Sequence, residues 1–131
     1  LWQKFDELIS SHLKTQKIVI VPVPLHRTKL RSRSFNQAEI IAHAVSSEFS
    51  IPIASNTLIR NRETKSQTKM KPFEREINIQ GAFAILTPNA VRGKTIILVD
   101  DVYTSGSTMN ECAKILLKSG AKTIWGITLA R

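Results

Sequence analysis

One continuous run, residues 96–108 (IILVDDVYTSGST), constrains the fold of this chain more than any other part of its sequence. It begins with four apolar residues, a pattern typical of a strand buried on both faces in a parallel sheet. Two adjacent carboxylates, Asp100 and Asp101, follow at the predicted strand end, and a turn of small residues then leads into an amphipathic helix pattern. Strand, small-residue turn and helix in this order predict an open α/β sheet, with a ligand site beyond the carboxyl ends of its strands.

Strand and helix patterns alternate along the rest of the chain. Short apolar or alternating runs predict strands at residues 18–23, 53–59, 81–86, 94–99 and 123–130, of which the second is the weakest. Apolar residues at three- and four-residue spacing predict helices at residues 1–14, 36–49 and 106–118, and Pro72 predicts a short helix to residue 79. The expected fold is therefore α/β, a mostly parallel sheet flanked by helices, in one domain of residues 1–131.

Local patterns refine two of these helices. Asn36 followed by Glu39 resembles a capping box at the start of the helix over residues 36–49. In the helix over residues 106–118 the apolar spacing predicts an inward face, and Gly120 is a plausible C-cap. The residues expected on that face are Met109, Cys112, Ala113, Leu116 and Leu117.

Several classes of protein are excluded or disfavoured. No apolar stretch is long enough for a membrane-spanning helix, and residues 1–13 do not form a signal peptide. The single cysteine, Cys112, excludes a disulfide framework or a cysteine-rich zinc site within the chain, and its place in an apolar helix predicts a buried small hydrophobe. This pattern is compatible with a reducing cytoplasm, which is the expected location. The sequence begins at Leu1 without methionine, so we expect a longer protein.

Positive charge is concentrated in two predicted loops. Residues 26–33 contain four basic and no acidic residues, and residues 60–76 contain six basic and three acidic ones, so these segments hold +7 of the formal net charge of +9. Because the excess positive charge is confined to two loops, it indicates an anionic partner. The phosphates of a small molecule and those of a nucleic acid are both candidates. Residues 61–71 have almost no apolar content and are expected to be mobile.

The chemistry of the run at residues 96–108 matches a sugar phosphate. A turn of small residues leaves backbone N–H groups accessible at a helix N-terminus, where the helix dipole favours a phosphate. Asp100 and Asp101 repel each other unless they accept hydrogen bonds from sugar hydroxyls or face a hydrated Mg²⁺ ion. The alternative interpretation, a helix cap after a polar strand end, is weaker because strand, carboxylates and turn occur together.

Other phosphate and nucleophile motifs are absent. The chain has no G-x-x-x-x-G-K-[ST] loop and no G-x-G-x-x-G loop, so neither a nucleoside triphosphatase nor a dinucleotide fold is supported. His12, His26 and His43 have no spacing that would supply a base to a serine or threonine nucleophile.

Residues 96–108 resemble the phosphoribosyl pyrophosphate (PRPP) motif of type I phosphoribosyltransferases, although Tyr103 stands where most members have an aliphatic residue. Residues 21–27 (VPVPLHR) and 33–38 (RSFNQA) are similar to the ComF family, which includes late competence proteins; Ser34 stands where that family usually has glycine. The similarity spans residues 18–131 and also includes Arg60, Thr64, Gln67, Arg75, Asn78, Gly81, Phe83 and residues 129–131.

This resemblance implies a set of site residues. Asp100 and Asp101 would bind the ribose hydroxyls of PRPP and hold Mg²⁺ through PRPP, directly or through water. The 5-phosphate would be held by Thr104, Ser105, Gly106, Ser107 and Thr108. Pyrophosphate would be contacted by Leu25, His26 and Arg27. Arg60 and Arg75, in the segment expected to close over the reacting centre, are the candidate catalytic residues.

The expected function is therefore that of a Mg²⁺-dependent phosphoribosyltransferase with PRPP as donor and an unidentified acceptor base, linked to DNA uptake in natural competence. The alternative is a non-catalytic protein of the same fold that binds single-stranded DNA or a competence helicase. A PRPP synthetase-like subunit is a weaker third hypothesis, since no ATP site is visible. The sequence leaves open whether the protein forms a homo-oligomer. Many ComF members also carry an N-terminal zinc module, whose cysteines this chain lacks.

Overall fold

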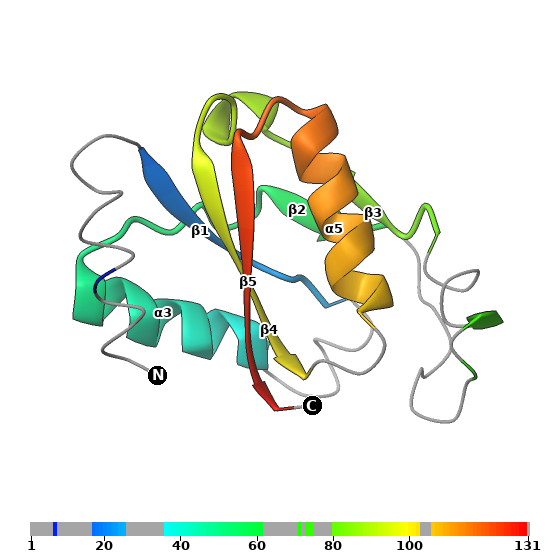
Figure 1. Ribbon diagram of the computed structural model, residues 1–131, viewed down its shortest axis with the longest axis horizontal. Helices are drawn as coiled ribbons and strands as arrows, with labels where there is room; N and C mark the ends of the chain where they lie inside the picture. The colour runs from blue at the N-terminus through cyan, green and yellow to red at the C-terminus, as the bar shows by residue number, and fades with distance from the viewer. Residues whose placement is uncertain are drawn as a thin grey trace.

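A computed structural model of the chain describes residues 7, 17–25, 36–61, 71, 73–74, 80–102 and 106–130. Its elements are β1 (Ile18–Pro22), α3 (Gln37–Phe49), β2 (Leu58–Arg60), β3 (Phe83–Ile85), the 3-10 helix η1 (Pro88–Ala90), β4 (Thr95–Val102), α5 (Ser107–Lys118) and β5 (Thr123–Ala130) (Figure 1). The predicted helices at residues 1–14 and 72–79 lie outside the described residues, except that Glu7, Phe73 and Glu74 are helical.

The main sheet among the described residues has three parallel strands in the order β1-β4-β5. Every residue of β1 is buried, as are the first five residues of β4. Burial on both faces explains why these strands are continuous apolar runs, and it confirms the predicted parallel sheet. Because the strands are parallel, their carboxyl ends meet at one edge of the sheet.

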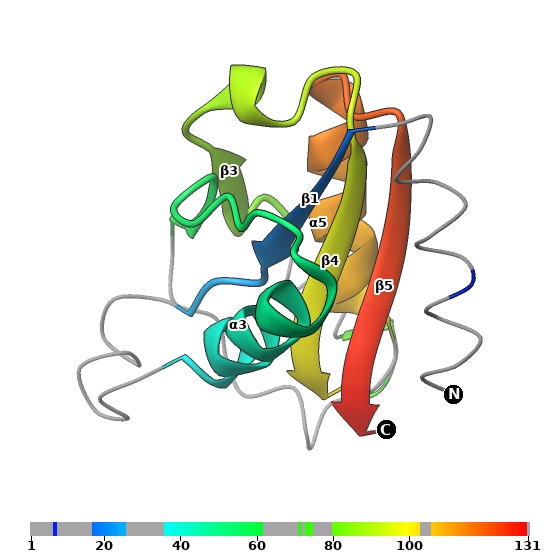
Figure 2. The same cartoon turned by 90° about the vertical axis from the view of Figure 1, so that its left-hand side faces the viewer.

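Helices cover both faces of the sheet, with α3 and α5 on opposite sides (Figure 2). Alternate residues of the central strand divide between two apolar clusters: Ile96 and Leu98 pack with the α5 side, and Ile97 and Val99 with the α3 side. Each such fully buried side chain contributes about 1.5–3 kcal/mol to stability. The strongest strand of the sequence is thus the centre of the three-layer core. No helix within the described residues is long and apolar enough to cross a membrane.

Two strand predictions need correction. The strand predicted within residues 53–59 is shorter and lies later than the range suggests: Ile53 makes only an isolated parallel bridge to Ile20, and the strand β2 begins at Leu58. A turn with Asn56 in the left-handed region (φ 62) separates the two parts, so that β2 pairs antiparallel with β3 outside the main sheet. The strand predicted at residues 94–99 continues to Val102 as β4, because β5 pairs with it along its whole length.

The helices predicted at residues 36–49 and 106–118 are confirmed as α3 and α5, with smaller corrections. Residue Asn36 caps α3 as predicted, but its Oδ1 accepts from the N–H of Ala38 (3.1 Å) rather than that of Glu39. Its Nδ2 also donates to the carbonyl of Val23 (3.0 Å), which ties the start of α3 to the end of β1. In α5 the prediction that Leu117 faces inward is wrong: it is 51% exposed, since Met109, Cys112 and Leu116 define the buried face.

Candidate functional site

The candidate site lies where the carboxyl ends of β1 and β4 meet. The register pairs Pro22 with Val99, and the N–H of Val23 donates to the carbonyl of Val99 (2.8 Å). The half-buried Leu25 follows directly, so the loop predicted to contact pyrophosphate begins beside the carboxyl end of β4. Its next residues, His26 and Arg27, lie outside the described part of the chain.

The two predicted carboxylates are the sixth and seventh residues of β4. Both Asp100 and Asp101 are half-buried, and Asp100 pairs with Thr128 of the neighbouring strand β5. Met109, in the first turn of α5, packs against β5, because a Cβ atom added to Gly126 would lie 2.7 Å from the Met109 Cε atom. The carboxylates therefore lie inside the sheet at its carboxyl edge rather than on a free loop, and their backbone positions are fixed by strand pairing.

The electrostatics of this pair are dominated by burial. Burial raises the pKa of Asp100 most, and a hydrogen bond to the Asp101 side chain and the charge of Asp101 act in the same direction, so that the net pKa is about 7. The backbone N–H of Asp101, which donates to Asp100 Oδ1 (2.9 Å), and the charge of Arg60 lower the pKa of Asp100. The Asp100 carboxyl therefore keeps its proton to a higher pH than a free aspartic acid does, and a cation or a hydroxyl donor at the site would favour its ionised form.

Arg60, at the end of β2, reaches this site from a distant part of the chain. The register of β2 and β3 pairs Arg60 with Phe83, and the Arg60 Cζ atom lies 5.3 Å from the centre of the Phe83 ring. Its charge acts on both Asp100 and Cys112. The structure therefore places one predicted catalytic candidate where its charge acts on Asp100, while the other, Arg75, lies outside the described residues.

The start of α5 is an open helix N-terminus, at the place where the sequence predicts that a phosphate binds. Gly106 is buried and takes a left-handed conformation (φ 83) that favours glycine, and it stands at the N-cap with no side chain to cover the helix end. Ser107 and Thr108 form the half-buried first turn, which contains no acidic residue. The N–H groups and the dipole of this end favour an anion. Thr104 and Ser105 lie outside the described residues.

Sequence analysis missed the partner of Arg60. Phe83 is 4% exposed and stacks with the guanidinium, although the sequence separates the two residues by an entire predicted loop. Only knowledge of the β2–β3 pairing could have joined them, because neither residue carries a local pattern that indicates the other.

The donor set fits a magnesium ion only together with a ligand. Among the described residues, no group of three or more His, Cys, Asp or Glu side chains could hold a metal ion. Mg²⁺ usually keeps several waters and is held by one or two carboxylates plus substrate phosphates. Asp100 and Asp101 are the carboxylates that would hold such an ion, and its remaining oxygen ligands would have to come from phosphate and water.

The fold and this site define a class of protein. Residues 36–131 match the phosphoribosyl transferase domain family, and the chain belongs to it. The resemblance to the ComF family is also confirmed. The chain is 35% identical over 114 residues to competence protein F of Haemophilus influenzae, covering 85% of this chain and 50% of that protein. It is 33% identical over 128 residues to competence protein ComFC of Bacillus subtilis, covering 97% and 50%.

A third relative is DNA utilization protein YhgH of Escherichia coli (strain K12), which is 34% identical over 105 residues, or 80% of this chain and 45% of that protein. The chain thus spans about half the length of these relatives. Solved structures confirm the type I phosphoribosyltransferase fold. A hypoxanthine phosphoribosyltransferase from Staphylococcus aureus has a TM-score of 0.59 at 10% identity, over 98% of this chain and 60% of its own. Phosphoribosylpyrophosphate synthetase from Mycobacterium smegmatis has a TM-score of 0.55 at 18% identity, over 98% and 32%.

Proposed function

We propose that this domain binds PRPP together with Mg²⁺ and transfers the phosphoribosyl group to an acceptor base. One observation carries the proposal: a carboxylate pair near the end of β4 is followed closely along the chain by the open N-terminus of α5. Acceptors for hydroxyl groups and donors for a phosphate, placed next to each other along the chain, are the groups that the two ends of a ribose 5-phosphate require.

In this proposal each group of residues has its own task. Asp100 and Asp101 accept hydrogen bonds from the ribose hydroxyls, and the turn formed by Thr104, Ser105, Gly106, Ser107 and Thr108 holds the 5-phosphate. The loop that begins at Leu25 and continues through His26 and Arg27 contacts the pyrophosphate. When bound, Mg²⁺ neutralises charge on the departing pyrophosphate.

Transfer at C1 of the ribose passes through a state with oxocarbenium character, as in glycoside chemistry. The chain must therefore stabilise an anion that leaves while it shields a cation from water. Arg60 provides a cation at the site whose position the Phe83 ring supports. Arg75 and the segment at residues 61–71 remain predicted contributors to closure over the reacting centre.

We further propose a role in DNA uptake during natural competence, inside the cytoplasm where PRPP is available. The printed names of the relatives, competence protein and DNA utilization protein, support this role. The chain spans about half the length of each relative, so the role in DNA uptake is proposed from the names of longer proteins.

An acceptor screen tests the proposed chemistry. The protein would be incubated with PRPP, Mg²⁺ and single candidate bases or amines, while released pyrophosphate is measured. We expect one acceptor to give release that Asp100→Asn abolishes and that Glu48→Gln, an exposed carboxylate on α3, leaves unchanged. Release that is equal in the wild type and Asp100→Asn would exclude this site as the source.

The charge distribution favours a second candidate function, in which the fold has lost chemistry and binds single-stranded DNA or a competence helicase. Its motivation is the +7 carried by residues 26–33 and 60–76. Here we expect salt-dependent affinity for single-stranded DNA, unaffected by PRPP, and no pyrophosphate release with any acceptor. Turnover with one acceptor would decide against this candidate.

A further inference from the structure

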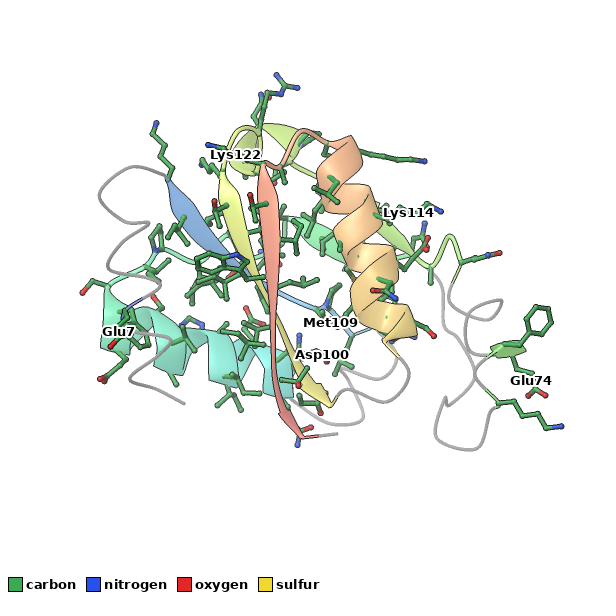
Figure 3. The ribbon with its side chains drawn as sticks, viewed as in Figure 1. Glu7, Glu74, Asp100, Met109, Lys114 and Lys122 are labelled. Atoms are coloured by element: carbon green, nitrogen blue, oxygen red, sulfur yellow. The ribbon has the colours of Figure 1, made fainter. Side chains whose placement is uncertain are left out.

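The amino-terminal edge of the parallel sheet is a basic surface that the proposed function does not use. A lysine stands directly before each strand: Lys17 before β1, Lys94 before β4 and Lys122 before β5. The register pairs the first residues of the three strands with one another, so the lysines form a row across the sheet. Figure 3 shows Lys122 at the end of the sheet opposite to Asp100.

Backbone hydrogen bonds hold this row in place. The N–H of Thr95 donates to the carbonyl of Lys17 (2.9 Å), and the N–H of Lys122 donates to the carbonyl of Lys94 (2.8 Å). Lys17 and Lys122 are exposed, and Lys94 is half-buried. The main chain of the three lysines is therefore ordered before any ligand arrives, which lowers the entropic cost of binding.

Two further cations extend the row into one surface. The N–H of Gly93 donates to the carbonyl of Gly120 (2.8 Å), and a Cβ atom added to Gly120 would lie 3.2 Å from Cγ of Arg92. The aliphatic stem of the exposed Arg92 thus lies across Gly120, and the exposed Lys118 ends α5 beside the same turn. We call this surface the basic edge; it consists of Lys17, Arg92, Lys94, Lys118 and Lys122.

The segments that form most of the basic edge contain no acidic residue to neutralise it. Residues 80–99 and 112–130 include neither Asp nor Glu. In Figure 3 the labelled carboxylates Glu7, Glu74 and Asp100 all lie away from Lys122. Cations on adjacent strands repel one another, so an external polyanion would stabilise this arrangement.

We propose that the basic edge binds the phosphodiester backbone of a nucleic acid without regard to base sequence. Adjacent strands lie about 4.8 Å apart, so the lysine row is about 10 Å long. One strand of DNA carries about three charges over this length. A line of three cations matches a linear array of phosphates better than the two-dimensional array of lipid headgroups. This surface is distinct from the loops at the other end of the sheet, and the inference stands whether or not the domain transfers phosphoribosyl groups.

Fluorescence anisotropy with a short labelled oligothymidine, titrated at several salt concentrations, tests the proposal. Each lost contact with a single strand should reduce the slope of log K against log salt by about 0.7, so the triple variant Lys17→Gln/Lys94→Gln/Lys122→Gln should lose about 2. Its affinity at 0.1 M salt should fall on the order of 100-fold. As a control for folding, the triple variant should have the same midpoint of thermal unfolding as the wild type.

Single substitutions provide a matched control. Lys122 and Lys114 are both exposed, but Lys114 lies in the middle of α5, away from the edge (Figure 3). We expect Lys122→Gln to reduce the salt slope and Lys114→Gln to leave it unchanged. A duplex of the same length is titrated in a parallel experiment. Binding to either the single strand or the duplex supports recognition of the phosphodiester backbone, and the form with the higher affinity identifies which nucleic acid the basic edge prefers.

Several results would overturn the proposal. They are absence of oligonucleotide binding by the wild type, equal salt slopes for the wild type and the triple variant, and equal effects of Lys122→Gln and Lys114→Gln. Binding only to vesicles of anionic lipid would assign the edge to a membrane instead. Excess PRPP with Mg²⁺ should not displace the oligonucleotide, because the basic edge and Asp100 lie at opposite ends of the sheet; displacement would place the nucleic acid at the other end.

Discussion

The backbone N–H of Asp101 donates a 2.9 Å hydrogen bond to Oδ1 of Asp100, so one carboxyl of the pair is oriented by the main chain of the other. This bond stabilises the ionised form of Asp100, whereas burial and the neighbouring Asp101 side chain oppose it, and the net effect is a pKa of about 7. The resting site thus disfavours two negative charges in one place. A ligand that brings Mg²⁺ or hydroxyl donors removes this penalty.

The raised pKa of Asp100 makes the stability of the fold depend on pH. Well below the ordinary pKa of 3.8, the carboxyl is protonated in both the folded and the unfolded chain. As the pH rises from about 4 to about 7, only the unfolded chain releases the proton, so the free energy of unfolding contributed by Asp100 falls and then stays low. We expect Asp100→Asn to unfold less readily than the wild type at pH 8, by about 1–3 kcal/mol.

Urea unfolding at pH 5 and pH 8 measures this difference. The gain from Asp100→Asn should shrink toward pH 4, where the wild-type carboxyl carries no charge. An equal gain at both pH values would show that it has another cause.

The contact between Arg60 and Phe83 should be measurable as an interaction energy. We expect the double-mutant cycle of Arg60→Met and Phe83→Leu to give a coupling of about 0.5–2 kcal/mol, since the cation lies 5.3 Å from the ring centre in a half-buried position. The same cycle with Arg92→Met, at the opposite end of the sheet, should give no coupling. Similar values for the two cycles would mean that the arginine and the ring do not interact specifically.

Gly106 and Gly93 form a natural pair for testing the phosphate site. Both have positive φ values (83 and 72), so alanine at either position should destabilise the fold by about 1–2 kcal/mol. Only Gly106→Ala should also weaken PRPP binding, because Gly106 caps the open end of α5 and Gly93 lies at the far edge. Calorimetric titration of both variants with PRPP and Mg²⁺ makes the comparison. An equal loss of PRPP affinity in the two variants would mean that Gly106→Ala weakens binding only by destabilising the fold.

Cys112 should be inert in the folded protein. It is fully buried, and burial together with the charges of Asp100 and Glu111 raises the pKa of its thiol. We expect a disulfide reagent to modify Cys112 at the rate at which the chain opens, with a marked acceleration in urea. Modification in native buffer at the rate of an exposed thiol would contradict the buried position.

The sequence predicted the parallel core well because its physical cause is local. A strand buried on both faces must be apolar throughout, and the runs that became β1 and β4 show this without any knowledge of their partners. The short strand β2 was misplaced, since three residues carry little periodicity and their pairing with β3 depends on a distant segment. Leu117 was assigned to the core because spacing alone could not separate it from the buried Leu116.

The site was predictable to the extent that it is contiguous in sequence. Asp100, Asp101 and Gly106 are close along the chain, and strand, turn and helix order fix how they meet. The stacking of Arg60 on Phe83 and the raised pKa of Asp100 depend on tertiary burial, which no local pattern encodes. Pairing across β4 and β5 likewise placed Thr128 beside Asp100 without any indication in the sequence.

The most direct test of the central claim is calorimetric titration of the protein with PRPP, with and without Mg²⁺. The wild type and the Glu48→Gln control should bind PRPP in a Mg²⁺-dependent manner at pH 8, where Asp100 is mostly ionised. The variant Asp100→Asn/Asp101→Asn should bind at least about tenfold more weakly, which corresponds to the loss of about 1.4 kcal/mol or more. Equal binding by the wild type and this variant would contradict the assignment of the β4 carboxylates to PRPP.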